Sequence, residues 1–281
     1  MTDRFFDPLS RLAWQSRLTL PPRCPRLPVI LNGQQVGSVE PQLLDQLLPA
    51  HGDLAKNGFS MQLRLATDIT GASWQINGDG TRAFTLLAQA LHEADLGHVR
   101  TQWRNEALAV INSDGQQVAS AERGIFRLLG MATRAVHLNG RTDDGHIWLQ
   151  QRALNKATDP GLWDTLMGGM VAASDTMTQA LQRETWEEAG INLTQVQALH
   201  AGGRFTVQRP NVVDGGIGYV VERIDWFEGL LPANLHPVNQ DGEVLQFALM
   251  QPEDIRRLLT DKKITDEAAL ILLGSRFGPA L

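Results

Sequence analysis

Three glutamates fall on one side of a predicted helix near the middle of the chain, shortly after a pair of glycines. The segment 168–191 has the sequence GGMVAASDTMTQALQRETWEEAGI. Counted at 100° per residue from Met177, its apolar stripe continues through Glu184 and Glu188, and Glu187 lies at the margin. Carboxylates crowded on the inner side of a helix repel one another unless a cation or an arginine neutralises them. Because Mg²⁺ and Mn²⁺ prefer carboxylate oxygens, the pattern predicts a divalent-metal site after a paired-glycine turn.

The same segment resembles the box of the Nudix hydrolases, G-x5-E-x7-R-E-U-x-E-E-x-G-U, in which U is a bulky aliphatic residue. The matching positions are Gly169, Arg183, Glu184, Glu187, Glu188, Gly190 and Ile191. Two positions depart from the box, because Asp175 stands where the family has glutamate and Thr185 stands at the first U. Neither departure touches the three helix carboxylates. A chance match on a solvated acidic helix is the weaker interpretation of this segment.

The resemblance implies a role for each residue of the box. Glu184 and Glu188 are expected to be the principal metal ligands, and Glu187 to share a metal or bind it through water. The carbonyl of Gly168 would supply a further oxygen. The glycine pair would allow a close backbone approach that a side chain would obstruct. Glu187 and Glu188 are therefore also expected to take part in catalysis.

Four basic or acidic residues are further candidates for the reaction. Arg183 is expected to orient a glutamate and to brace the loop, with an ordinary surface ion pair as the alternative. Glu243 precedes a predicted strand and is expected to act as general base or extra ligand, unless it is a solvated turn residue. Arg152 and Lys156 follow another strand, where they would bind the phosphates or form a basic loop in solvent.

Other side chains carry weaker signals. His137 and His146 have no partner at metal-ligand spacing, so a structural role is favoured for both. Trp163 precedes the box and would stack on a heteroaromatic ring or, by default, pack in the core.

Composition and charge exclude several classes of protein. The chain has 281 residues, of which 43% are hydrophobic, and this size suits two domains better than one. A net charge of -6 argues against nucleic-acid binding. Cys24 is the only cysteine, which excludes a disulfide framework within one chain and fits a reducing cytoplasm. Because there is no apolar run of about 18 residues, we expect a soluble, unprocessed, cytoplasmic protein without membrane contact.

The predicted elements divide the chain into an N-terminal α+β domain, residues 1–124, and a Nudix domain, residues 125–281. In the first domain we expect a hairpin at 28–39, helices at 41–48 and 81–94, and strands at 61–65 and 107–111. A connecting helix is expected at 122–129. In the second we expect strands at 134–138, 146–151, 199–207, 217–223 and 244–250, and helices at 252–259 and 266–273. A mixed sheet with helices on both faces suits this order, and the resemblance implies an α/β/α sandwich.

Motifs outside the box resemble one Nudix subfamily, whose members include the Nudix part of yeast thiamine pyrophosphokinase and related bacterial and plant proteins with an extra N-terminal domain. The motifs are WRNE at 103–106, ERGIFRLLGMATRAVHLNG at 122–140 and DGEV at 241–244. This resemblance implies a pyrophosphohydrolase, dependent on Mg²⁺ or Mn²⁺, that acts on thiamine diphosphate or its oxidised or damaged analogues. A homodimer is compatible with it. Hydrolysis of nucleoside diphosphate derivatives and ligand sensing without catalysis are the alternatives.

The two predicted domains are not separated by a flexible linker. We therefore expect the N-terminal domain to close over the Nudix site and to contribute to recognition of the organic part of a small-molecule diphosphate. An aromatic side chain stacked on that part is the expected means of recognition.

Overall fold

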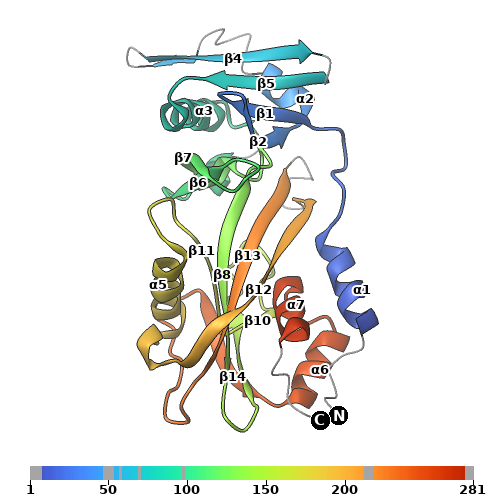
Figure 1. The fold of residues 1–281 in the computed structure, drawn as a ribbon, viewed down its shortest axis with the longest axis vertical. Helices are drawn as coiled ribbons and strands as arrows, with labels where there is room; N and C mark the ends of the chain where they lie inside the picture. Colours follow the sequence, from blue (N-terminus) through green and yellow to red (C-terminus); the bar gives the residue numbers. More distant parts are fainter. Residues whose placement is uncertain are drawn as a thin grey trace.

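The computed structural model describes residues 8–46, 54–56, 59–68, 71–96, 99–211 and 218–275. Its strands form sheets that follow one another along the long axis of the molecule (Figure 1). A five-stranded sheet lies at one end, a two-stranded sheet lies in the middle, and a seven-stranded sheet fills the other end.

The five-stranded sheet contains the predicted hairpin. Its order is β2-β1-β5-β4-β3, with β1 Leu27–Leu31, β2 Gln34–Val39, β3 Leu54–Lys56, β4 Phe59–Asp68 and β5 Gly71–Asn77. The turn between β1 and β2 has positive φ at Asn32 (49°) and Gly33 (80°), as a two-residue hairpin turn requires. The predicted helix at 81–94 is α3 (Gly80–Ala94), which buries Phe84 and Leu87 in the core beside this sheet. α2 spans Pro41–Asp45, while Leu47 and Leu48 of the predicted helix lie outside the described residues.

The middle of the molecule links the five-stranded sheet to the rest. α4 (Val99–Gln102) precedes β6 (Ala107–Ile111), which pairs with β7 (Gln117–Glu122). The helix predicted at 122–129 is wrong, because only a single 3₁₀ turn forms there, η3 (Arg123–Ile125). The residues of this stretch that follow Gly124 are mostly apolar and buried: Ile125, Phe126, Leu128 and Leu129. A helix buries one face, whereas a compact turn buries side chains that point in several directions.

The seven-stranded sheet is mixed and is built around β8. Its strands are β8 Ala132–Arg141, β9 Ile147–Arg152, β10 Trp163–Asp164, β11 Met167–Met170, β12 Gln197–Pro210, β13 Tyr219–Leu230 and β14 Val244–Met250. β8 runs parallel to β13 and antiparallel to β9 and β11. The predicted strands of this half are therefore confirmed, except that Ile217 lies outside the described residues.

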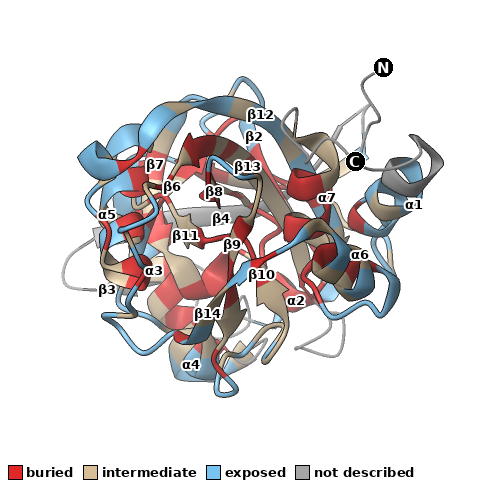
Figure 2. Ribbon diagram, turned by 90° about the horizontal axis from the view of Figure 1, so that it is seen from below, coloured by how far each residue is buried: buried red, intermediate tan, exposed pale blue. Residues whose placement is uncertain are grey.

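Helices cover both faces of this sheet, as predicted. α5 (Met177–Ala189) lies on one side, and α6 (Pro252–Thr260), α7 (Asp266–Gly274) and α1 (Pro8–Leu18) lie on the other (Figure 1). Side chains of β8 alternate between the two layers: Val136 and Leu138 pack with Leu181 of α5, whereas Ala135 packs with Leu270 of α7. Buried residues gather in the strands and on the inner sides of the helices (Figure 2). The short η4 (Leu193–Gln195) follows α5.

Several elements were not predicted from the sequence. The glycine pair lies in strand β11, where Gly168 is paired with His137, so the predicted turn at this position is wrong. Glycine has low strand propensity, and this concealed the strand. The other elements without a prediction are α1, β3, β5, α4, β7, β10 and η4. Among the described helices, none has the length and apolar character needed to cross a membrane.

Candidate active site

α5 fixes how far each of the three glutamates is buried. The helix begins with a capping box between Thr176 and Gln179 and ends at Gly190, whose φ of 63° is left-handed. Glu188 is 4% exposed, the Glu184 side chain is 14% exposed and that of Glu187 is 45% exposed. The apolar stripe therefore predicted correctly that Glu184 and Glu188 face the protein and that Glu187 lies at the margin.

The two glycines of β11 leave the space that the Glu184 carboxylate and the His137 ring occupy. A Cβ atom on Gly169 would lie 2.0 Å from Cδ of Glu184, and one on Gly168 would lie 2.5 Å from the ring of His137. Neither glycine has positive φ, so the requirement is for space and not for an unusual backbone conformation. The Gly168 N–H also donates to Oε2 of Glu188 at 3.0 Å, which ties the strand to the helix.

Glu188 is a buried carboxylate held only by neutral donors. Besides Gly168, Nε2 of Gln150 donates to its Oε2 at 2.9 Å. Within the described part of the chain, no basic side chain lies at ion-pair distance from Glu188. Burial raises the pKa of Glu188 to about 8, although these two hydrogen bonds oppose the rise. The side-chain oxygen of Gln150, Oε1, is itself buried without a hydrogen-bond partner among the described residues.

Arg183 joins the acidic residues of the box. Its guanidinium donates to Glu184 at 2.8 Å, to Glu187 at 3.0 Å and to Asp175 at 3.0 and 3.1 Å. It therefore contacts both the glutamates and the loop, and the shorter Asp175 still reaches it. Burial raises the pKa of Glu184 to about 7 against the opposing effect of Arg183.

The donor set of the box suits a divalent cation, although its side chains do not yet surround one point. In the described part of the chain, no three acidic, His or Cys side chains are close enough together to hold a metal ion. Arg183 bridges Glu184 and Glu187 and so occupies the space between their carboxylates. The burial of Glu188 without a basic partner is the observation that fits a cation, because a buried carboxylate is costly until a positive charge neutralises it.

One cleft of about 1010 Å³ contains all the candidate site residues. They are Arg152, Lys156, Gly168, Arg183, Glu184, Glu187, Glu188 and Glu243. Lys156 forms an ion pair with Glu243, and Arg152 forms one with Asp164 at 3.2 Å. We call Gly168, Gly169, Glu184, Glu187 and Glu188 the box side of this cleft.

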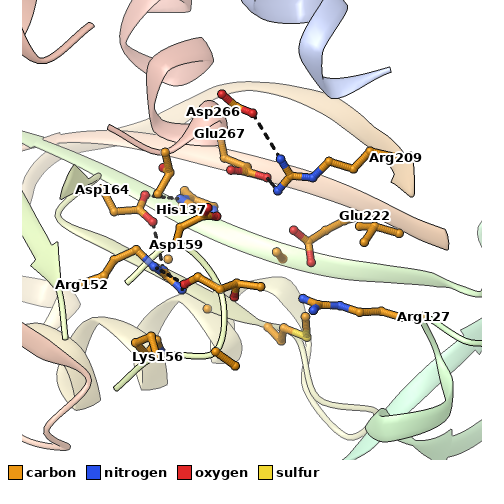
Figure 3. Close-up of a pocket in the computed structure, with 18 of the residues that line it drawn as sticks. Arg127, His137, Arg152, Lys156, Asp159, Asp164, Arg209, Glu222, Asp266 and Glu267 are labelled. Atoms are coloured by element: carbon orange, nitrogen blue, oxygen red, sulfur yellow. Dashed lines mark hydrogen bonds and ion pairs between the residues drawn. The ribbon is translucent and has the colours of Figure 1, made fainter. Parts of the chain in front are cut away.

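The opposite wall, which we call the α7 side, comprises Arg209, Glu222, Asp266 and Glu267. Arg209 of β12 contacts Asp266 at 3.2 Å and Glu267 at 3.0 Å, at the first turn of α7. Glu222 of β13 accepts from the Thr133 hydroxyl at 3.2 Å. Burial raises the pKa of Glu267 to about 7, and Arg209 opposes this rise. Figure 3 shows these side chains around the same space as Arg127, Arg152 and Lys156.

Sequence reasoning did not identify the α7 side. Its residues come from the consecutive strands β12 and β13 and from the later helix α7. Asp266 and Glu267 resembled the acidic residues that commonly begin a helix. Glu222 lay in a predicted strand without a motif, and Arg209 lay two residues beyond the end of the strand predicted at 199–207. No local signal in the sequence identified this wall.

The weaker candidates divide into cleft and core residues. His137 lines the cleft, and its Nδ1 is 2.9 Å from the Thr165 hydroxyl, while burial lowers its pKa. His146 lies beside Asp144 in the turn after β8. Trp163 packs with the core formed by α6 and α7 and does not line the cleft. No Phe, Trp or Tyr is among the described residues that line it, so they offer no aromatic platform there.

The first 124 residues also contribute side chains to the cleft. Arg17 and Arg23 reach it from α1 and the segment that follows, and Glu106 and Arg123 reach it from the open end of the β6–β7 hairpin. Arg17 pairs with Asp266 on the α7 side at 2.9 Å. The cleft is therefore lined from both halves of the chain.

Comparisons with known proteins agree with the box. The family profile of the NUDIX domain matches residues 130–271. An uncharacterised Nudix hydrolase of Pseudomonas aeruginosa is 31% identical over 105 residues, which are 37% of this chain and 60% of that protein. The chloroplastic Nudix hydrolase 20 of Arabidopsis thaliana is 29% identical over 233 residues, which are 80% of this chain and 60% of that protein.

Solved structures include a Deinococcus radiodurans protein, 19% identical, with a TM-score of 0.48 over 59% of this chain and 97% of the other. The alignments span 60% or less of the length of these curated relatives. The profile covers half of the chain and includes β8, β11 and α5, which build the box side. The chain belongs to the Nudix hydrolase family.

Proposed function

We propose that this chain is a metal-dependent pyrophosphohydrolase that cleaves a diphosphate linkage in a small molecule. The carrying observation is Glu188, a buried carboxylate that has only neutral donors and lies in the same cleft as Arg152 and Lys156. Nudix hydrolases generally use Mg²⁺ or Mn²⁺. Glu184, Glu187 and Glu188 would hold such an ion. A bound divalent ion would neutralise phosphate oxygens and lower the pKa of a bound water.

The chain's own residues then bind and orient the diphosphate. Arg183 holds two glutamates in position through the contacts described above. Arg152 offers a planar fork to phosphate oxygens, and Lys156 offers a point charge. Glu243 forms an ion pair with Lys156 and therefore lies beside the proposed phosphate-binding residues. This position suits a general base or an extra metal ligand.

We propose thiamine diphosphate, or an oxidised or damaged analogue, as the substrate. The cleft is larger than a diphosphate alone requires, and its α7 side is lined by Glu222, Asp266 and Glu267. Carboxylates there favour an organic part that is cationic or rich in hydrogen-bond donors, as the thiazolium and aminopyrimidine rings of thiamine are. Specificity must come from this wall, because every diphosphate presents the same oxygens to the metal.

A side-by-side assay tests the proposal. The full-length protein with Mg²⁺ is given thiamine diphosphate, its oxidised analogues, ADP-ribose and nucleoside triphosphates, and phosphate or monophosphate release is measured. We expect kcat/KM to be highest for the thiamine compounds. A higher kcat/KM for ADP-ribose or a nucleotide would contradict the proposed substrate class but would agree with metal-dependent cleavage of a diphosphate linkage. Absence of release from every compound, with Mn²⁺ bound, would favour ligand sensing without catalysis.

A further inference from the structure

Glu106 enters the cleft from outside the region matched by the Nudix profile. It immediately precedes β6, and its backbone oxygen accepts from the N–H of Arg123 at 2.8 Å. The next residue, Ala107, accepts through its own backbone oxygen from the N–H of Ala173 at 2.9 Å, and Ala173 lies in the loop between β11 and α5. The backbone at Glu106 is therefore fixed both to the end of β7 and, through Ala107, to the loop before α5.

The side chain of Glu106 is paired with Arg123. Oε2 of Glu106 lies 2.6 Å from Nη1 of Arg123, and the two side chains are 30% and 36% exposed. Both line the cleft. Glu106 also lies close enough to Glu184 for its negative charge to raise the pKa of the Glu184 carboxyl. The pair therefore lines the same cleft as the box glutamates, and both of its side chains are partly exposed.

Four acids that line the cleft, unlike Glu188, are paired with a basic side chain. Glu106 pairs with Arg123, Glu243 with Lys156, and Glu184 and Glu187 with Arg183. In each case a monovalent side chain neutralises a carboxylate. A divalent cation attracts carboxylate oxygens more strongly than a guanidinium or ammonium does, whereas those cations are suited to phosphate. A metal–diphosphate complex could therefore exchange partners with such pairs.

We infer that Glu106 is an additional carboxylate of the divalent-metal site, and that Arg123, its partner in this structure, turns to the diphosphate when the metal binds. This inference rests on the proposed function. Glu106 is thus a ligand supplied from the segment before the Nudix-matched region. Arg123 binds phosphate oxygens through a planar fork, and the pair links metal binding to substrate binding.

The first test measures Mn²⁺ binding to the full-length protein without substrate, by titration calorimetry. Glu106→Gln removes the charge and keeps the shape of the side chain. Asp114→Asn is the matched control, because Asp114 is an exposed acid in the turn of the same hairpin and does not line the cleft. We expect Glu106→Gln to raise the Mn²⁺ Kd by about fivefold or more, and Asp114→Asn to leave it unchanged. A smaller rise, or an equal rise in the control, overturns the inference.

Arg123→Gln separates a ligand from a structural ion pair. If Glu106 binds the metal, removal of its competing partner leaves the Mn²⁺ Kd unchanged or lowers it. Arg123→Gln also weakens the binding, in the presence of Mn²⁺, of methylenediphosphonate, a diphosphate analogue whose P–C–P bridge cannot be hydrolysed. A Mn²⁺ Kd raised as much as in Glu106→Gln would show that the pair only braces the hairpin, which overturns the inference. Circular dichroism checks that both variants fold.

The two proposals fail in different ways. A wild-type protein that binds no Mn²⁺ at the box contradicts the proposed function. If the wild-type protein binds Mn²⁺ and hydrolyses a diphosphate while both substitutions leave the Mn²⁺ Kd unchanged, only the role of Glu106 is lost.

Discussion

The box side and the α7 side of the cleft neutralise their acids in different ways. On the box side the carboxylates lie on one helix, and Glu188 is buried with neutral donors alone. On the α7 side, Arg209 of β12 reaches Asp266 and Glu267 of α7, so that the partners come from different elements. An uncompensated buried carboxylate suits a cation, whereas charges already paired across elements form a shaped polar wall. The comparison suggests chemistry on one side and selection on the other.

The largest expected effect is on the box side. Glu188→Gln should lower kcat by about 100-fold or more, close to 3 kcal/mol of activation free energy, because the amide cannot supply an anionic ligand. Initial rates with the best substrate measure the loss, and circular dichroism checks the fold. Glu253→Gln is the control, since Glu253 is an exposed acid on α6 with a side chain 52% exposed. A Glu188→Gln protein that keeps more than about a tenth of wild-type kcat would remove the basis for the comparison.

A second prediction tests whether space, and not charge alone, builds the box side. Gly169→Ala places a methyl group where Glu184 now lies, so Glu184 must move. We expect kcat to fall by about tenfold and the Mn²⁺ Kd to rise, with the fold retained. Unchanged kinetics would mean that Glu184 tolerates displacement and that the glycine serves another purpose.

A third prediction concerns the α7 side. Glu267→Gln keeps an oxygen that can accept from Arg209 but removes the charge. For thiamine diphosphate we expect KM to rise about fivefold while kcat changes little. For ADP-ribose we expect no comparable rise in KM. If kcat falls equally for both compounds, the α7 side contributes to catalysis and not, as proposed, to substrate recognition alone.

The smallest expected effect is on stability. The folded-state pKa values of Glu184 and Glu188, about 7 and about 8, lie above the ordinary value of 4.5. Between pH 4.5 and pH 8 the folded chain therefore binds more protons than the unfolded chain, and the free energy of unfolding falls as pH rises. Thermal melts without metal should therefore show a Tm that falls as pH rises through this range.

Addition of Mn²⁺ should restore the lost stability and do so more at pH 8 than at pH 6, because protons compete with the metal for these carboxylates. Saturation at about 100 times the Kd stabilises by about 2.7 kcal/mol. Glu188→Gln is the reference, since it has no Glu188 carboxyl to titrate. Identical pH profiles for this variant and the wild type would exclude Glu188 as a source of the effect.

The box side could be predicted from the sequence because its residues are contiguous. Helical periodicity ranked the burial of Glu184, Glu187 and Glu188 correctly. The strand nature of Gly168 and Gly169 was not predictable from propensity, since tertiary pairing with β8 decides it. The family resemblance, not periodicity, identified the layered sandwich.

The α7 side could not be predicted because long-range pairing creates it. Glu222 faces the cleft since β13 runs parallel to β8, with Glu222 beside Thr133. Arg209 is brought to α7 by the pairing of β12 with β13. Alternation along a strand predicts which residues share a face, but it does not say which strand is the neighbour. The stretch 122–129 failed for a related reason, because Ile125, Phe126, Leu128 and Leu129 are buried in the core of the five-stranded sheet, which long-range packing builds.

Helix α1 packs against α7, and this contact has a consequence for the order in which the chain can fold. Leu18 belongs to the same small core as Leu270, and Arg17 holds Asp266. During synthesis α1 leaves the ribosome long before α7 is made. The apolar side of α1 therefore stays exposed until α7 emerges. The α7 side of the cleft is then completed late, because α7 is the last of the described helices to emerge. Slow synthesis of the C-terminal part would prolong a state in which α1 has no partner and the cleft lacks Asp266 and Glu267.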